Sequence, residues 1–188
     1  MRSLTALLLS VSLAAGASED WTLDALMAEL HQVRGAAAHF TETKTAHMLT
    51  RPLQASGTLT YAAPDKLEKV TESPAHEAIR LEGDILSGKR ADGEDFSVDI
   101  ASHAEIAALV EGIRSTLAGD LATLRRYYEV AFAGDREHWR IDLSPKDKKI
   151  KEKIEFIRIS GSGAVIGGII VSETDGDRSE MTVTPDRP

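Results

Sequence analysis

Apolar residues recur at every third or fourth position in two segments of the chain, and this spacing predicts two amphipathic helices. The first helix covers residues 23–33, with Asp20 or Thr22 as its N-cap, because both side chains can accept a hydrogen bond from a free backbone amide. Gly35 follows the last periodic residue and marks the end of the helix. Its apolar stripe consists of Leu23, Leu26, Met27, Leu30 and Val33.

The second helix covers residues 106–117 and has a stronger start signal. The segment Ser102-His103-Ala104-Glu105 matches a capping box, in which the Ser and Glu side chains satisfy each other's free backbone amides. Gly119 ends this helix, and Asp120 is expected to cap one short further turn. The apolar stripe consists of Ile106, Leu109, Val110, Ile113 and Leu117.

Almost all of the remaining chain has strand character. Apolar and polar residues alternate, as at Trp139, Ile141 and Leu143, which predicts strands with one apolar face and one wet face. Gly-Asp pairs separate several of these runs and are typical of tight turns between antiparallel strands. We therefore expect about eleven short strands, near residues 37–48, 54–62, 66–72, 76–82, 84–90, 94–99, 127–133, 137–143, 154–160, 165–173 and 178–184.

The expected fold class is α+β, mostly β. A single antiparallel sheet of about eleven strands rarely stays flat, so we expect it to curl into an unclosed (half) β-barrel with two to three helices as its lid or plug. The apolar stripes of the helices need an apolar surface, and the concave face of the sheet provides one. Such a half-barrel contains either a solid core or a lined cavity.

The first 17 residues have the pattern of a signal peptide. Arg2 gives a positive start, residues 4–15 are apolar, and Ala15-Gly16-Ala17 is a small-residue cleavage site. The apolar run is too short to cross a bilayer, which takes about 20 residues. No cysteine is present to carry a lipid. We therefore expect residues 18–188 to form one exported domain that works in the periplasm without a lipid anchor.

Composition excludes several classes of function. Without Arg2, the chain has 21 basic and 30 acidic side chains, so its net charge is 21 − 30 = −9. This negative charge argues against nucleic acid as a ligand. The absence of cysteine excludes disulfides and thiol catalysis. The six histidines lack metal-binding spacing, and residues 160–163 form a turn pattern rather than the nucleophile elbow of a hydrolase. We predict no catalytic residue, no metal and no cofactor.

Four short motifs follow the export signal in a fixed order. They are Phe40-Thr41-Glu42-Thr43-Lys44, the run Pro52-Leu53-Gln54-Ala55-Ser56-Gly57-Thr58-Leu59-Thr60-Tyr61, Pro64-Asp65-Lys66-Leu67 and Gly176-Asp177-Arg178-Ser179. In order and spacing they resemble the periplasmic outer-membrane lipoprotein carrier proteins, the LolA-like family. The resemblance covers essentially all of residues 18–188.

The resemblance implies a carrier with a helical lid over an apolar cavity for acyl chains. Such a carrier takes a lipoprotein, or other lipid-like cargo, from an inner-membrane donor complex and passes it to an outer-membrane acceptor; we expect a monomer. The alternative is a periplasmic sensor or interaction domain that recognises lipidated or misfolded proteins. An enzyme is the third hypothesis and has the least support, because no nucleophile and base can be paired from motifs.

One departure from the family pattern concerns the lid. Lipoprotein carriers often have a basic residue just before the proline of the second hairpin, where the resemblance implies an arginine that holds the lid closed. This chain has Ala62-Ala63-Pro64 there. Aromatic residues, which are usually abundant in the cavities of this family, make up 5% of the chain. Both departures favour a cargo other than a lipoprotein.

The candidate site residues follow from strand alternation together with the resemblance. We interpret Lys44 as a charge at the cavity mouth or at a strand edge, and Lys146–Lys153 as a solvated loop or a docking segment for an acidic partner or lipid headgroups. The predicted cavity residues are Phe40, Leu59, Tyr61, Leu67, Leu81, Leu86, Val130, Phe132, Trp139 and Ile141, and the predicted lid residues are Leu26, Leu30, Leu109, Ile113 and Leu117.

Overall fold

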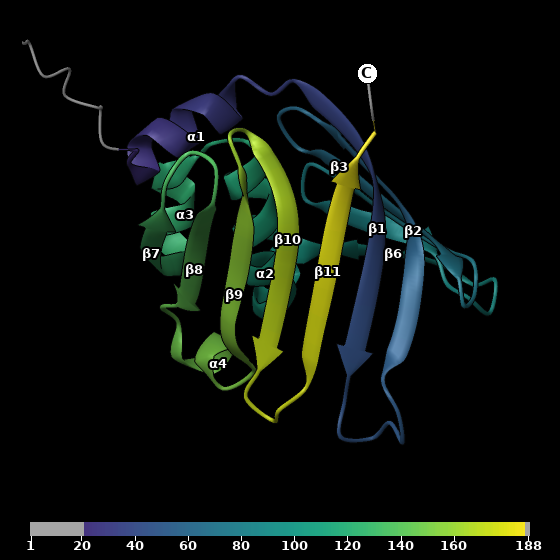
Figure 1. Cartoon of the computed structure of the whole chain (residues 1–188). Helices are drawn as coiled ribbons and strands as arrows, with labels where there is room; N and C mark the ends of the chain where they lie inside the picture. Colours follow the sequence, from purple (N-terminus) through teal and green to yellow (C-terminus); the bar gives the residue numbers. More distant parts are fainter. Residues whose placement is uncertain (1–20, 187–188) are drawn as a thin grey trace, which may run out of the picture.

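The computed structural model describes residues 21–186 and shows one continuous sheet with helices on one side (Figure 1). The predicted signal peptide and the alternative N-cap Asp20 lie outside the described residues.

Eleven strands form the sheet, as the sequence predicts. All neighbouring strands are antiparallel, in the order β6-β5-β4-β3-β2-β1-β11-β10-β9-β8-β7. The strands are β1 (Gly35–Thr45), β2 (Leu53–Ala62), β3 (Lys66–Ser73), β4 (Glu77–Glu82), β5 (Ile85–Lys89), β6 (Asp95–Asp99), β7 (Tyr128–Gly134), β8 (Trp139–Pro145), β9 (Ile154–Ser162), β10 (Val165–Glu173) and β11 (Arg178–Pro185).

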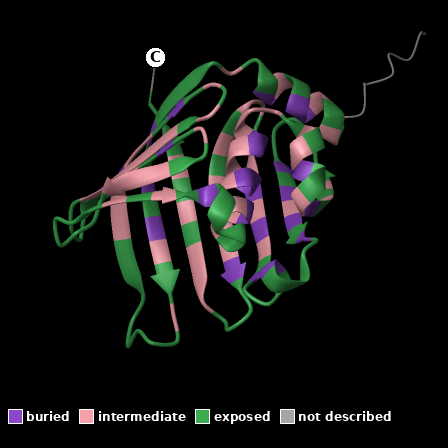
Figure 2. Cartoon of the chain, turned by 180° about the vertical axis from the view of Figure 1, so that it is seen from behind, coloured by how far each residue is buried: buried purple, intermediate pink, exposed green. Residues whose placement is uncertain are grey.

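The sheet is open, because β6 and β7 lie at its two edges and do not pair with each other. Pairing of β1 with β11 joins the first and last strands of the chain at the centre of the sheet. The part from β3 to β6 curls towards the side that carries the helices (Figures 1 and 2). The predicted half-barrel is therefore confirmed, and we call the face towards the helices the concave face.

Within residues 21–186, four α-helices and one 3₁₀ turn complete the fold. Thr22 caps the first helix by accepting a hydrogen bond from the Ala25 amide, and Asp120 caps the third in the same way through the Thr123 amide. Both caps are among those that the sequence predicts. The elements are α1 (Leu23–His31), η1 (Ile100–Ser102), α2 (Ala104–Leu117), α3 (Leu121–Tyr127) and α4 (Lys148–Lys151).

The predicted capping box at the start of α2 is wrong. The N-cap is His103, whose side chain makes no capping hydrogen bond. Asp99 instead accepts a hydrogen bond from the Ala101 amide at 2.9 Å and starts the 3₁₀ turn that contains Ser102. Ser102 therefore belongs to the preceding turn and is not available as a cap.

The segment 146–153 is not a plain loop, because it contains the short helix α4. Asp147 accepts hydrogen bonds from the amides of Lys149 and Ile150, at 2.8 and 3.2 Å. Ile150 is buried, whereas the lysines of the segment are exposed. One apolar residue among lysines is too weak a periodic signal to predict a helix.

The main hydrophobic core combines residues of the four helices with residues of the strands β7, β8 and β9. Leu26 and Leu30 of α1 pack with Trp139, Ile141 and Ile159, all at most 1% exposed. Burial of an apolar side chain of this size stabilises a fold by about 1.5–3 kcal/mol. Among residues 21–186, no helix has the length and hydrophobicity needed to cross a bilayer.

Candidate functional site

Strand register places all ten predicted cavity residues on the concave face. Phe40 of β1 pairs with Gly57, and two-residue steps along β2 lead from Gly57 to Leu59 and Tyr61. On this side, register continues from Tyr61 to Leu67 of β3 and on to Leu81 of β4 and Leu86 of β5. On the other side it continues from β1 through β11, β10, β9 and β8 to β7. The shared face is a finding; binding of a ligand to these residues stays a prediction.

The ten residues fall into two environments. Trp139 and Ile141 are fully buried members of the main core, and Val130 and Phe132 pack against it while partly exposed. The others lie on β1 to β5, outside this core cluster. Of these, Phe40, Tyr61 and Leu81 are buried and Leu59, Leu67 and Leu86 are half-buried.

A small hollow lies at β2 to β4, mostly on the face of the sheet opposite the concave face. Its volume is about 290 Å³, and Tyr61, Leu67 and Leu81 contribute to its lining. Most other lining residues, among them Lys66 and Glu82, are polar and lie on that opposite face, so the hollow is not a cavity of the concave face. The Tyr61 hydroxyl is buried and has no hydrogen-bond partner among the described residues, and burial raises its pKa, an effect that Arg34 opposes.

The five predicted lid residues also divide. Leu26 and Leu30 of α1 are fixed in the main core. Leu109, Ile113 and Leu117 of α2 are only half-buried, as is the rest of the α2 apolar stripe. The expectation that this stripe is the packing face of the helix is therefore only partly met: Leu109 packs against the core cluster, but the fully buried residues of α2 lie elsewhere.

The buried face of α2 consists of small and polar residues. Gly112 approaches the sheet so closely that a Cβ atom there would lie 3.1 Å from Ile157 and 3.2 Å from the Tyr128 hydroxyl. The same hydroxyl donates a 2.6 Å hydrogen bond to the Ala108 carbonyl. Burial is the main cause that raises the pKa of Tyr128, so it is a neutral donor at ordinary pH. The helix is positioned by close approach and hydrogen bonds rather than by its apolar stripe.

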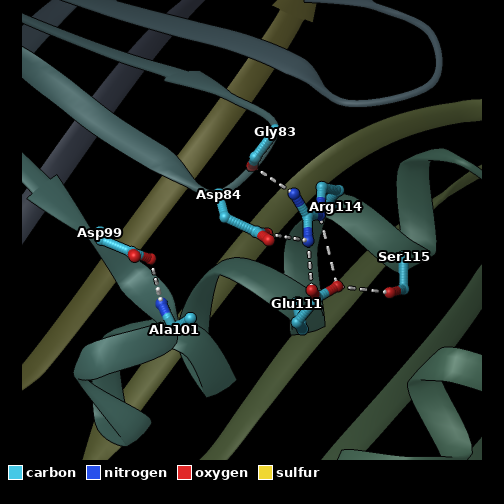
Figure 3. A network of polar contacts seen from close by, with 7 residues as sticks. All are labelled: Gly83, Asp84, Asp99, Ala101, Glu111, Arg114 and Ser115. Atoms are coloured by element: carbon cyan, nitrogen blue, oxygen red, sulfur yellow. Dashed lines mark hydrogen bonds and ion pairs between the residues drawn. The ribbon is translucent and has the colours of Figure 1, made fainter.

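Arg114 fastens α2 to the turn between β4 and β5 (Figure 3). Its guanidinium donates to the Gly83 carbonyl at 2.5 Å and to Asp84 at 3.4 Å. It also pairs with Glu111 one turn earlier, and Glu111 accepts a 3.0 Å hydrogen bond from Ser115. Burial alone would lower the pKa of Arg114, but Glu111 and Asp84 raise it, so the guanidinium stays charged.

Sequence reasoning identified the missing arginine before Pro64 but not Arg114. Hydrophobic periodicity assigns Arg114, like any charged residue, to the solvent-exposed face of the helix and predicts no contact for it. The available signal was the Glu111–Arg114 spacing, which places both side chains on one helix face. Contact with the distant Gly83–Asp84 turn depends on the tertiary fold.

A charged cluster lies at the centre of the concave face, around Glu42 of β1. Lys69 and Ser179 donate hydrogen bonds to the Glu42 carboxylate at 2.5 and 2.6 Å, and Lys44 lies 3.6 Å from it. Burial alone would raise the pKa of Glu42, but the hydrogen bonds from Lys69 and Ser179 lower it, with a smaller contribution from the Lys44 charge. We call Glu42, Lys44, Lys69 and Ser179 the Glu42 cluster. The two predicted roles of Lys44, a charge at the cavity mouth or at a strand edge, stay predictions.

One group of possible metal ligands is present among the described residues, at the lower ends of β1 and β11 in Figure 1. His47, Asp175 and Asp177 offer ligand atoms within 4.8 Å of one another. The His47 amide and Nδ1 both contact the same Asp177 oxygen, at 2.9 and 2.8 Å. Hydrogen bonds therefore account for this arrangement without an ion, and all three residues come from loops or turns that sequence spacing does not relate.

An open antiparallel sheet with helices on its concave face is a binding or carrier fold. Residues 14–184 match the family model described as outer membrane lipoprotein carrier protein LolA-like, so the chain belongs to the LolA-like family. No curated protein matches the sequence.

Several solved structures are similar at low identity. The LolA superfamily protein NE2245 from Nitrosomonas europaea is 10% identical, with 89% of this chain and 95% of that chain covered and a TM-score of 0.46. The Pseudomonas aeruginosa MucA/MucB complex is 9% identical, with 86% and 55% covered and a TM-score of 0.44. A DUF1329 family protein from Desulfovibrio piger is 9% identical, with 86% and 88% covered and a TM-score of 0.37. Likenesses this distant say nothing about function.

Proposed function

We propose that the protein is a periplasmic carrier that binds the acyl chains of a lipoprotein or other lipid-like cargo on its concave face and transfers them from the inner to the outer membrane. The observation that carries this proposal is the half-buried apolar stripe of α2, opposite the small and polar residues that hold the helix in place. A helix positioned in this way can move without breaking a large apolar interface. Family membership and the predicted signal peptide support the periplasmic carrier role.

Binding must be moderated if cargo is to be released. Burial of an acyl chain of about 15 methylenes gives on the order of 12 kcal/mol before any opposing term, at about 0.8 kcal/mol each. Displacement of α2 would break the contacts of Arg114 with Gly83 and Asp84 and that of Tyr128 with Ala108. Their loss opposes ligand binding, so net affinity can be modest and exchange reversible.

In this mechanism Arg114 does what the resemblance assigns to an arginine before Pro64. The position before that proline is Ala63, and the charged contact comes from the helix to a turn of the sheet instead. If a different arginine holds the lid closed, the cargo can also differ from that of the lipoprotein carriers.

A substitution on the stripe tests the proposal. Ile113→Glu is expected to abolish saturable binding of the neutral probe N-phenyl-1-naphthylamine, because the carboxylate would lie in the apolar binding surface. Ile113 is already half-buried, so we expect the variant to lose less than about 1.5 kcal/mol of unfolding free energy. Ala104→Glu is the matched control, because it adds the same charge to an exposed position of α2. Probe titration and urea unfolding are measured on both variants and the unchanged protein.

Two results would contradict the proposal. Absence of saturable binding in the unchanged, folded protein would indicate a solid core. A loss of several kcal/mol in Ile113→Glu would show that the stripe is permanently buried.

A further inference from the structure

The Glu42 cluster is unusual because it places charges among the apolar residues of the concave face. Phe40 and Met181 are its neighbours on the same face of β1 and β11, and the Lys69 ammonium lies 4.8 Å from the centre of the Phe40 ring. Gly57, opposite Phe40 on β2, has no side chain to separate Lys69 from Glu42. An ion pair here is expensive to desolvate, and a face that served acyl chains alone would be better built without one.

The cluster has unused donors but a satisfied acceptor. The Glu42 carboxylate is 5% exposed and accepts hydrogen bonds from Lys69 and Ser179, with Lys44 also close. Each ammonium has three N–H donors, and each directs one contact to Glu42. Lys69 and Lys44 are 25% and 49% exposed, so their remaining donors can be reached from solution.

The charge balance favours an anion. Two ammonium groups and one carboxylate give the cluster a charge of +1, in a chain whose net charge is −8. Glu77 shares this face, opposite Thr71 on the neighbouring strand, and is not among the hydrogen-bond partners of the cluster. A phosphate group offers acceptors for both ammonium groups at once.

We propose that Lys44 and Lys69 of the Glu42 cluster bind the phosphate headgroup of an amphiphile whose acyl chain lies on the neighbouring apolar surface. Glu42 and Ser179 hold Lys69 in position, and Lys44 closes the site from the solvent side. This inference rests on the proposed acyl-binding function and adds the headgroup class to it. A free phosphate compound would share the headgroup chemistry but lack the chain, so the experiment separates the two.

The test uses ligands that differ only in their polar or apolar part. N-phenyl-1-naphthylamine bound to the protein is displaced by 1-palmitoyl-glycerol 3-phosphate, by uncharged 1-palmitoyl-glycerol or by glycerol 3-phosphate. We expect the first ligand to bind at least about tenfold more tightly than the second, a preference of about 1.4 kcal/mol. Glycerol 3-phosphate should not displace the probe, and added salt should reduce the preference.

Substitutions then assign the preference to the cluster. Lys44→Met and the double variant Glu42→Gln/Lys69→Met should reduce the preference to about threefold or less and leave the affinity for 1-palmitoyl-glycerol unchanged. The double variant removes both partners, so that no buried carboxylate is left unpaired. Lys66→Met is the matched control, because Lys66 forms a similar ion pair with Glu82 on the opposite face of the sheet.

Each outcome decides the matter. An equal affinity for the two palmitoyl ligands would overturn the headgroup site while leaving the acyl-binding function intact. A preference that persists in both cluster variants, or that Lys66→Met also removes, would show that the cluster is only structural. Displacement by glycerol 3-phosphate at the same concentration would show a phosphate site independent of lipid. If no palmitoyl ligand displaces the probe, the proposed acyl-binding function fails together with this inference.

Discussion

The two halves of the sheet share one alternating pattern but differ in what covers them. On the concave face of β8 and β9, Trp139, Ile141 and Ile159 are at most 1% exposed, because they belong to one core with residues of α1, α2 and α3. On β3 to β5, Leu81 is buried, but its neighbours on the same face, Leu67, Ile79 and Leu86, remain half-buried. The β8–β9 half is therefore a fully buried core, whereas the β3–β5 half has apolar side chains that remain partly exposed to solvent.

This difference shows that alternation alone does not define a core. Alternation predicts which residues share a face. Whether a face becomes core depends on the element that covers it, and α2 reaches the β4–β5 side through Arg114 rather than through its apolar stripe. Large apolar residues without cover are typical of a surface that binds something else.

The largest expected effect comes from the same substitution in each half. Ile159→Ala removes a fully buried side chain of the β8–β9 half and should reduce the free energy of unfolding by about 3 kcal/mol. Ile79→Ala, on the same face of β4, should reduce it by about 1 kcal/mol, because that side chain already meets solvent. Urea unfolding of both variants gives the comparison. Equal losses would show that the two halves are one core.

Much of the fold follows from local signals in the sequence. Alternating residues and Gly-Asp turns predict all eleven strands, and Gly83, with a φ of 59°, adopts the left-handed conformation that such a turn requires. The start of α2 was mispredicted because Asp99 and Ser102 compete as caps, and local sequence does not show which one the preceding strand will position. The short helix α4 has too few apolar residues to be recognised.

The candidate site is less predictable than the fold. Strand alternation correctly places the ten predicted cavity residues, such as Phe40, on one face of the sheet. The rotation of α2 about its axis depends instead on Gly112, which lets the helix approach Tyr128 and Ile157. Periodicity selects the most apolar face of a helix as the buried one. In α2 the small residues pack more closely than the large ones, and a sequence pattern does not contain that information.

An intermediate effect is expected when α2 is released from the less covered half. The double variant Glu111→Gln/Arg114→Met removes the contacts of Arg114 with Gly83 and Asp84 without leaving Glu111 as an unpaired charge. We expect α2 to open more easily by about 1.4 kcal/mol, so that its amides exchange with solvent about tenfold faster.

If opening precedes acyl binding, the affinity for N-phenyl-1-naphthylamine should rise by a similar factor, because a larger fraction of the protein is competent to bind. Arg125→Met, an exposed position on α3, is the control and should change neither quantity. Faster exchange with unchanged affinity would separate the motion of α2 from ligand binding and would contradict its role as a lid.

The smallest effect concerns the end of the sheet where the halves meet, at the pair formed by His47 and Asp177. The hydrogen bond and charge of Asp177 raise the pKa of His47 above its ordinary value of 6.5, and hydrogen bonds from the His47 amide and ring hold the pKa of Asp177 below 3.8. Stability from the raised His47 pKa is fully present below pH 6.5 and is lost as the pH rises through that raised value. Stability from Asp177 is present above pH 3.8 and is lost as the pH falls through its lowered pKa.

The pair should therefore join the β1–β2 loop to the β10–β11 turn between these two limits and loosen at higher pH. Titration of the His47 ring signals by NMR should give a pKa above 6.5 that returns towards this value in Asp177→Asn, while Asp175→Asn changes it less, because Asp175 acts on His47 through charge alone. Both groups are exposed, so the midpoint of unfolding should change little and the Ile159→Ala and Ile79→Ala comparison should keep its order across this pH range. A reversal of that order above the His47 pKa would mean that this loop contact, rather than the cover provided by the helices, keeps the two halves distinct.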